Sequence, residues 1–336
     1  MLSQVWSGRN DAHAFIAMGL KLLLEVVLFC RGLGLPEEVV ASAPGKVILL
    51  GEHFVVYGVP AIVAAIELRA RASVSMRADS SVRVEAPDLG LSGLFRPGAS
   101  EVEGDEGAEE ALRPIFLAVD EVRKRLGRRR GLNISISSSI PIAAGLGSSA
   151  AVAVSASAAT CALLKGLIDK ELVFRAALEA EKLVHVSPSG VDPAISTHGG
   201  LIIYKRGVGI QKLEIEAPLE LVVGDTGLKR STGALVSAVR ALRNRRPELF
   251  QRLLSAAEEL ISEALDALRR GDALALGELM DINQGLLSAI GVSNLALEKL
   301  VHAARKAGAL GAKLTGAGGG GCMIALVEEG LSLIHI

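Results

Sequence analysis

Apolar residues recur along this chain at two spacings, and each spacing predicts a different kind of element. The strongest helical pattern covers residues 247–270, and helices are also predicted over the alanine-rich residues 148–165 and over residues 171–185. In the first of these the apolar positions are Leu249, Leu253, Ala257, Leu260, Ala264 and Leu268. In the third they are Leu172, Ala176, Leu183 and Val184. We therefore expect long helices that pack against other elements.

Shorter apolar or alternating runs predict β-strands between these helices. The predicted strands cover residues 47–50, 61–65, 70–76, 132–136, 201–204, 221–223 and 323–327. Because helices and strands are mixed through both halves, the pattern predicts an α+β protein whose two domains share one cleft. A change in composition at residues 199–201 predicts the boundary between domains 39–200 and 201–330. Residues 87–110, rich in Gly, Glu, Asp and Ser, are predicted to form an exposed loop.

The two ends of the chain fit neither domain. Residues 14–30 are apolar but include Lys21 and Glu25, and they are short for a membrane span. Their charge pattern, without a clean small-residue cleavage site after it, disfavours a signal peptide. We therefore interpret residues 1–38 as an extra segment and residues 331–336 as a foreign or truncated tail. A membrane anchor is the alternative, and it predicts insolubility that vanishes when residues 14–30 are deleted.

Composition narrows the possible partners. The 36 Lys and Arg residues nearly balance the 37 Asp and Glu residues, so no global field favours a nucleic acid or an acidic membrane. The basic run at residues 123–130 is predicted to be a solvated helix end. Three cysteines without a Cys-x-x-Cys pair argue against a disulfide framework and a zinc site, and they favour a cytoplasmic protein.

The segment at residues 141–150, Pro-Ile-Ala-Ala-Gly-Leu-Gly-Ser-Ser-Ala, joins a predicted strand to the alanine-rich helix. Gly145 and Gly147 allow the backbone to approach an anion closely, and a helix N-terminus supplies free N–H groups. Ser148 and Ser149 could cap the helix or hold a metal-bound phosphate. The pattern predicts a phosphate site, with an ordinary serine-capped turn as the alternative. It matches neither a Walker A nor a dinucleotide-binding fingerprint.

Two other segments combine glycines with polar residues. Residues 43–58 place Lys46 beside a Pro-Gly turn, ahead of an apolar strand, with Glu52 and His53 at the end of that strand. Considered alone, His53 is more typical of a satisfied polar residue in a core. Residues 313–322 contain five glycines in six positions, which is costly in conformational entropy. Such a loop predicts a close approach to a ligand or to another loop.

Two carboxylates flank a Pro-Ser-Gly turn after the helix at residues 171–185. Glu181 lies near the end of that helix, and Asp192 follows the turn, which can fold it back. Two carboxylates so placed could divide their work, one binding a metal ion and one handling a proton. Two ordinary surface acids are the alternative.

Together and in this order, these segments resemble the motifs of the GHMP kinases, the superfamily of galactokinases, homoserine kinases, mevalonate kinases and phosphomevalonate kinases. The resemblance runs from residue 41 to residue 327 and is closest to the mevalonate kinases, including a further segment at residues 279–300. Galactokinases would carry Arg in place of Lys46. The resemblance implies an N-terminal α/β domain with a phosphate loop before a long helix, and a ferredoxin-like α+β C-terminal domain.

The resemblance also implies an activity: ATP-dependent phosphorylation of the 5-hydroxyl of (R)-mevalonate, with Mg²⁺, in isoprenoid biosynthesis. Asp192 would accept the hydroxyl proton or orient the hydroxyl, and Lys46 would pair with Asp192. Ser149 and Glu181 would bind Mg²⁺. The ATP phosphates would lie on Pro141, Ala143, Ala144, Gly145, Leu146, Gly147, Ser148 and Ser149. The acceptor would contact Glu52, His53 and Thr232, and the third motif, Gly316, Ala317, Gly318, Gly319 and Gly320, would approach the phosphate loop.

Other functions remain open at this point. A kinase of the same fold could act on phosphomevalonate or a sugar; a phosphorylated acceptor would need extra cations, for which Lys229 and Arg230 are candidates. A non-catalytic sensor would be expected to lack Lys46, Asp192 or Glu181, and all three are present. The expected partners are ATP and mevalonate without nucleic acid or membrane, and a homodimer is possible.

Overall fold

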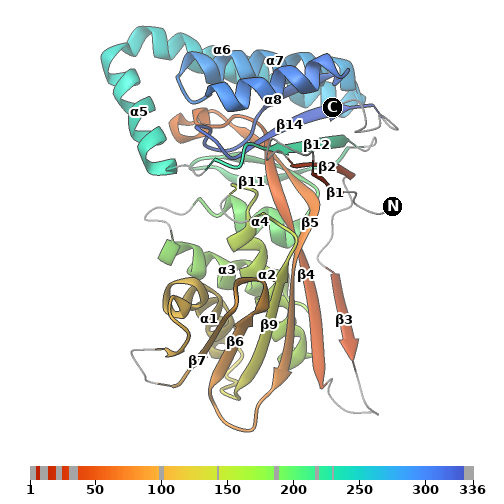
Figure 1. The fold of residues 1–336 in the computed structure, drawn as a ribbon, viewed down its shortest axis with the longest axis vertical. Helices are drawn as coiled ribbons and strands as arrows, with labels where there is room; N and C mark the ends of the chain where they lie inside the picture. Colours follow the sequence, from red (N-terminus) through yellow and green to blue (C-terminus); the bar gives the residue numbers. More distant parts are fainter. Residues whose placement is uncertain are drawn as a thin grey trace.

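The chain forms two lobes, each built on its own β-sheet (Figure 1). The computed structural model describes residues 37–97, 102–141, 144–184, 189–215, 219–228 and 231–328, and the backbone of three short strands before them. These three are β1 (Val5–Ser7), β2 (Ala14–Gly19) and β3 (Glu25–Phe29). Of the predicted extra segment at residues 1–38, residues 1–4, 8–13, 20–24 and 30–36 lie outside the described residues, as does the predicted tail at residues 331–336.

The N-terminal lobe is built on a nine-stranded sheet. Its strands are β3, β4 (Glu38–Leu50), β5 (Ala61–Met76), β6 (Val82–Ala86), β7 (Leu91–Phe95), β8 (Glu103–Gly104), β9 (Leu132–Ser138), β10 (Leu201–Lys205) and β11 (Gly209–Leu213). All its pairings are antiparallel except that of β6 with β9. The long strand β5 pairs with β4 along most of its length and joins β10 to β9. The two strands predicted at residues 61–65 and 70–76 are therefore one strand.

Helices cover one face of this sheet. They are α1 (Ala108–Arg125), α2 (Ser148–Lys165), α3 (Lys170–Val184) and α4 (Val191–His198). The buried helix α2 lies against β4 and β5, and α1 and α3 pack on α2. By length and composition α2 could span a membrane, but 78% of it is buried inside the lobe, as expected of a core helix.

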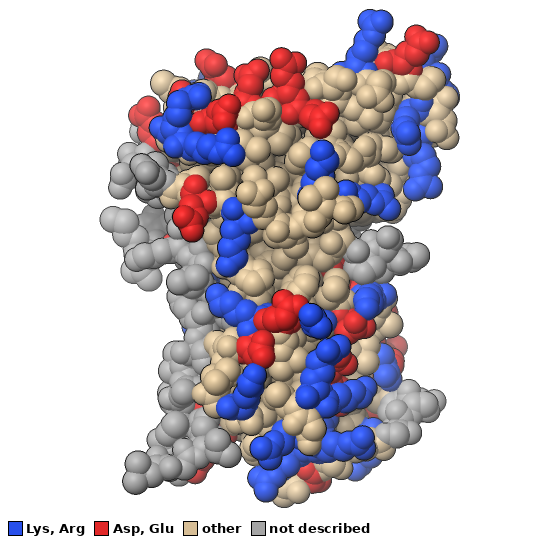
Figure 2. Space-filling model, turned by 180° about the vertical axis from the view of Figure 1, so that it is seen from behind, with Lys and Arg blue, Asp and Glu red and all other residues tan. Residues whose placement is uncertain are grey.

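The C-terminal lobe layers four helices against a smaller sheet (Figure 1). The sheet runs in the order β1, β2, β12 (Glu220–Asp225), β14 (Cys322–Val327) and β13 (Gly311–Leu314). The helices are α5 (Thr232–Arg245), α6 (Pro247–Arg270), α7 (Ala273–Ala289) and α8 (Leu295–Lys306). Charged side chains are spread over both lobes on the face shown in Figure 2, with Lys and Arg gathered at the far end of the N-terminal lobe.

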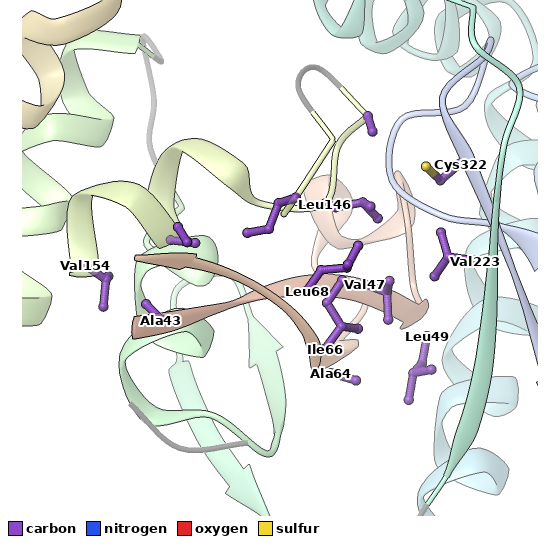
Figure 3. Packing of buried hydrophobic residues seen from close by; sticks show 14 of the residues in the cluster. Ala43, Val47, Leu49, Ala64, Ile66, Leu68, Leu146, Val154, Val223 and Cys322 are labelled. Atoms are coloured by element: carbon purple, nitrogen blue, oxygen red, sulfur yellow. The ribbon is translucent and has the colours of Figure 1, made fainter. Parts of the chain in front are cut away.

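One hydrophobic core runs through both lobes. Figure 3 shows buried residues of β4 and β5 between Leu146 and Val154 on one side and Val223 and Cys322 on the other. Strand β4 therefore has apolar neighbours in both lobes. Lys46 lies within this strand, and Glu52 and His53 follow its C-terminal end, so β4 fixes where those residues lie.

Most of the predicted elements are confirmed, but the loop predicted at residues 87–110 is wrong. This stretch contains a short 3₁₀ helix (Pro87–Leu89), β7, β8 and the beginning of α1. Some of its glycines lie in connecting turns, as at Gly90, where φ is 65°, but Gly93 lies in β7, which pairs with β6, and Glu103 and Gly104 form β8. Composition alone therefore does not distinguish these short strands from a loop.

Two helical faces also differ from the prediction. Leu183 is 53% exposed and Leu249 is 57% exposed, although both were placed on buried faces. Leu183 lies in the last turn of α3. Leu249 lies beside the buried face of α6, because the next residue, Phe250, is 1% exposed and its ring contacts Tyr57. In α6 the buried face instead includes Phe250, Leu254 and Ile261.

The sheet topology bears on the division at residue 200, which stays a prediction. Strands β10 and β11 follow that point but hydrogen-bond within the nine-stranded sheet. The chain next contributes a strand to the second sheet at β12. We therefore propose that the structural boundary lies between Leu213 and Glu220.

Candidate active site

The Gly-Leu-Gly-Ser-Ser segment forms a tight turn at the N-terminus of α2. Gly147 is the N-cap residue with φ of 76°, and no side chain caps the helix, so the hydroxyls of Ser148 and Ser149 are not used as caps. The backbone N–H of Lys46 donates to the carbonyl of Leu146 over 2.8 Å, which ties this turn to β4. A Cβ at position 147 would lie 2.8 Å from Cγ of Lys46. Only glycine therefore allows this approach.

Lys46 and Asp192 form an ion pair beside this turn. A register shift between Pro44 and Gly45 interrupts the pairing of β4 with β5, and Lys46 follows it directly. Such irregularities change the direction of nearby side chains. Asp192 lies in the first turn of α4. The Lys46 Nζ to Asp192 Oδ1 distance is 3.1 Å, and the side chains are 9% and 30% exposed. The predicted pairing is confirmed.

Glu181 lies on α3 and faces the same space. Burial, together with the nearby charge of Asp192, raises the pKa of its carboxyl to about 7, although the backbone of Gly190 and the cation of Lys46 act to lower it. Its buried Oε2 atom has no hydrogen-bond partner among the described residues. A carboxylate that is buried, repelled and incompletely bonded fits a site for a cation.

These groups surround a cavity of 310 Å³ between the two lobes. Its described lining includes residues that were all predicted for the site: Pro141, Gly145, Gly147, Ser148, Ser149, Glu181 and Asp192. Thr232, at the start of α5, closes the cavity from the C-terminal lobe. The small residues Ala177 and Ala180 on α3 also line it and were missed. Their helical spacing after Val173 marks a packed face, so only their small size could have suggested a cavity.

A second cavity of 280 Å³ lies on the other side of the same serines. It shares Ser148, Ser149 and Ala153 with the first, but its walls are apolar: Ala86, Leu89, Leu112, Ile115, Ile136 and Val152. Sequence reasoning missed it because part of this wall lies in the segment predicted to be a loop. An anion-binding turn with an apolar pocket on one side and two carboxylates on the other can hold an organic phosphate and a second reactant.

Glu52 does not line either cavity among their described residues. It is 1% exposed and forms a fully buried ion pair with Lys313, the third residue of β13. The amide of Asn283 on α7 donates to its other oxygen over 3.1 Å. Burial lowers the pKa of Lys313, and Glu52 opposes that shift. Glu52 thus joins the two lobes through Lys313 and Asn283, residues that the sequence did not single out.

His53, the next residue, also joins the two lobes. It has φ of 57°, the single positive value among the described residues other than glycine. Its ring Nε2 lies 2.8 Å from the carbonyl of Ala317, so Nε2 carries the proton and donates. The Thr315 hydroxyl donates to the Ile48 carbonyl over 3.0 Å and accepts from the Ile48 N–H over 2.9 Å. The glycine-rich motif is therefore fastened to the end of β4.

The remaining predicted residues have different placements. A Cβ at Gly318 would lie 2.1 Å from the carbonyl of Val292, and one at Gly319 would lie 2.8 Å from Leu235, so these glycines pack within the C-terminal lobe. The predicted approach of the motif to the phosphate loop stays a prediction. Ala144 and Leu146 are buried. Ala143, Lys229 and Arg230, which were also predicted for the site, lie outside the described residues.

The residues present fit a bound divalent cation that is completed by its ligand. No group of three or more His, Cys, Asp or Glu side chains in the described part of the chain could hold a metal ion. Glu181 and the hydroxyl of Ser149 line one cavity, so phosphate oxygens could supply the other ligands. This donor set, with few protein oxygens, is typical of Mg²⁺ bound with a nucleotide.

Two family models match successive parts of the chain, one in each lobe. The GHMP kinases N terminal domain matches residues 113–200, and the GHMP kinases C terminal domain matches residues 264–332. The chain is 44% identical to the mevalonate kinase of Pyrococcus abyssi over 87% of this chain and 89% of that one. The structure of L. major mevalonate kinase in complex with R-mevalonate superposes with a TM-score of 0.74 and 33% identity, covering 86% of this chain and 87% of that one. Methanococcus jannaschii mevalonate kinase gives a TM-score of 0.74 and 26% identity over 89% and 92%.

Proposed function

The chain belongs to the mevalonate kinases of the GHMP kinase superfamily, and we propose that it transfers the γ-phosphoryl group of ATP to the 5-hydroxyl of (R)-mevalonate. Its relatives are named for that activity, and the site holds what the reaction needs. Phosphoryl transfer requires alignment and charge neutralisation more than covalent help. The observation that carries the assignment is the Lys46–Asp192 ion pair in the cavity at the phosphate loop.

We assign the two cavities to the two substrates. The apolar cavity suits the base of ATP, and the shared serines place the phosphates between it and the catalytic cavity. The N–H groups at the start of α2 would hold those phosphates. Mevalonate would lie against Asp192 and Thr232 in the 310 Å³ cavity.

Asp192 would accept the proton of the 5-hydroxyl, or orient that hydroxyl, as the oxygen bonds to the γ-phosphorus. The bond from that phosphorus to the β,γ-bridging oxygen breaks, and ADP leaves. Lys46, held beside Asp192, would stabilise negative charge on the transferring group. Mg²⁺, held by Glu181 and Ser149, would supply charge neutralisation of the phosphates when bound.

Glu52 and His53 take a supporting role in this proposal. The described partners of both residues belong to the C-terminal lobe, so Glu52 and His53 join the two lobes. Thr232 is the predicted acceptor contact that lines the cavity. An unphosphorylated acceptor suits a site whose described lining contains no Lys or Arg besides the adjacent Lys46. Two buried cysteines, Cys161 and Cys322, far apart in the fold, agree with a cytoplasmic enzyme.

The proposal is tested by ADP release from ATP and Mg²⁺ with four separate acceptors: mevalonate, phosphomevalonate, galactose and homoserine. Turnover with mevalonate alone supports it. Turnover with phosphomevalonate in preference to mevalonate would contradict the proposal and would assign the protein as a phosphomevalonate kinase. ATP binding without turnover of any acceptor would favour a sensor.

A further inference from the structure

A third cavity, of 540 Å³, lies at the far end of the N-terminal lobe and shares no described residue with the two substrate cavities. It is bounded by α1, the end of β7 and the turn before β9. Five cations line it: Arg96, Arg113, Arg123, Lys124 and Arg129. Asp120 is the single acid in its described lining. Figure 2 shows Lys and Arg side chains gathered at this end of the lobe.

Arg123 is the buried centre of this cluster, at 5% exposure. Its guanidinium donates to the carbonyls of Ser80 and Arg129 over 3.0 and 2.9 Å, and to Asp120 over a longer 3.3 Å. Its buried Nε atom has no hydrogen-bond partner among the described residues. Asp120 is shared with Lys124 at 2.9 Å. A buried cation with one shared counter-ion and an unused donor is incompletely compensated.

The electrostatics of Arg123 agree with this geometry. Burial lowers the pKa of its guanidinium, Asp120 raises it, and the neighbouring cation of Arg129 lowers it again. Arg129 itself is exposed and forms no ion pair with another residue in the described ranges. A bound anion would offset both charges at once. The basic run at residues 123–130 therefore does more than end a helix, since two of its arginines and Lys124 line one cavity.

Other cations around the cavity already have acidic partners. Arg96 pairs with Glu103, and Arg113 pairs with Glu109. These pairs are partly or largely exposed, where an ion pair contributes little and can be exchanged for a stronger partner. Arginine is suited to such an exchange, because its planar fork matches phosphate oxygens.

Part of the cavity's lining, on α1 and at the end of β7, is apolar. The rings of Phe95 and Phe116 stack 4.4 Å apart with an angle of 4° between their planes, and Arg113 lies over the Phe95 ring at 5.8 Å. Phe116 is half-buried and lines the cavity with Leu117 and Pro97. A ligand here would meet Arg123, Lys124 and Arg129 near the end of α1, and the aromatic rings, with Arg113 beside them, about two helical turns earlier. Aromatic groups stack well on such a surface.

We propose that this cavity binds an organic phosphate whose other end is an aromatic ring. The phosphate lies against Arg123, Lys124 and Arg129, and the ring lies against Phe116. The site is separate from the catalytic cavity, so its occupant is neither the ATP nor the acceptor of the reaction.

Phenyl phosphate is the probe, used with the full chain while Mg²⁺ and a non-hydrolysable ATP analogue fill the nucleotide site. Titration calorimetry should show saturable binding of one phenyl phosphate. Arg129→Glu and Lys124→Glu should each weaken it by about 10-fold or more, as expected for lost charge-assisted contacts. Arg130→Glu is the matched control, because Arg130 is the next exposed arginine and lies outside the described lining; it should change binding by less than about 2-fold.

The contribution of the ligand's aromatic ring is tested with methyl phosphate, which lacks that ring and should bind more weakly than phenyl phosphate. Phe116→Ala should remove that difference, and thermal unfolding of this variant confirms that it is folded. The proposal is overturned if phenyl phosphate does not bind, if Arg130→Glu weakens binding as much as Arg129→Glu, or if the two phosphates bind equally to the unaltered protein. Mevalonate-dependent turnover should be retained in the Arg129→Glu variant. This measurement tests the kinase assignment independently of phosphate binding in the third cavity.

Discussion

Two lysine–carboxylate pairs lie along β4 and just beyond its end, and they differ in what surrounds them. Asp192 lines the cavity at the phosphate loop with its side chain 30% exposed, and Lys46 lies beside it at 3.1 Å. Glu52 and Lys313 are both fully buried in the seam between the lobes. The first pair can meet a substrate and the second cannot. We therefore propose that the same kind of ion pair serves catalysis in one place and joins the two lobes in the other.

This contrast shows why a motif does not assign a role to each of its members. Lys46, Glu52 and His53 belong to one short segment, and the resemblance implied that all three serve the substrate site. The strand places Lys46 at the cavity and turns Glu52 and His53 toward α7 and the glycine-rich motif. The alternative reading of His53 as a satisfied buried residue agrees with its bond to Ala317.

The largest expected effect comes from removing the carboxylate of the exposed pair. Asp192→Ala should lower kcat by roughly 10³-fold or more, because it removes the proton acceptor and the partner of Lys46. Steady-state ADP release measures this. Binding of the ATP analogue should change only a few-fold, since the phosphate loop remains; a variant that keeps kcat would remove Asp192 from the chemistry.

The largest effect on stability should come from the buried pair. Lys313→Met leaves Glu52 buried without its counter-ion, which should cost about 3 to 5 kcal/mol of unfolding free energy. Urea denaturation measures this. The double variant Lys313→Met, Glu52→Leu should recover much of the loss, because it removes both charges. If the double variant loses as much unfolding free energy as the two single variants together, the two residues are not coupled.

Lys46→Met should lower kcat by roughly 10²- to 10³-fold, the range expected for a lost electrostatic contact to a developing charge. Lys46→Arg keeps the charge and should recover part of this loss. The Lys46 variants should unfold within about 1 kcal/mol of the unaltered protein, because Asp192 remains in contact with solvent. A large loss of stability would instead show that Lys46 has a structural role like that of the buried Glu52–Lys313 pair.

Glu181 should give the smallest effect, seen as a dependence of stability on pH. Its pKa is about 7 in the folded protein against an ordinary 4.5. Between these values the folded protein holds a proton that the unfolded chain has lost, so the free energy of unfolding falls as pH rises, by about 2 kcal/mol. Urea denaturation at about pH 5 and pH 8, without nucleotide or divalent cation, measures it. Glu181→Gln should abolish this component, and an unchanged pH dependence would contradict the buried, unpaired state of Glu181.

The catalytic half of the site could be predicted because its parts are local. The glycines of the phosphate loop, the helix after them, and Lys46 with Asp192 are each marked by short segments of sequence. The pair of Glu52 and Lys313 joins residues 261 positions apart, and no local pattern connects them. The 280 Å³ apolar cavity was missed for a similar reason. It is assembled from β6, α1, β9 and α2, and part of its wall follows turns whose glycines suggested a loop.

The central claim is that the exposed pair performs chemistry while the buried pair holds the lobes together. Asp192→Asn and Glu52→Gln make the same change, carboxylate to amide, in the two pairs. Turnover with mevalonate and thermal unfolding should be measured for both variants in parallel. We expect Asp192→Asn to lose turnover with Tm nearly unchanged, and Glu52→Gln to lower Tm by several degrees while the folded fraction retains most of its turnover. The reverse pattern, or loss of turnover with unchanged Tm in both variants, would contradict the account.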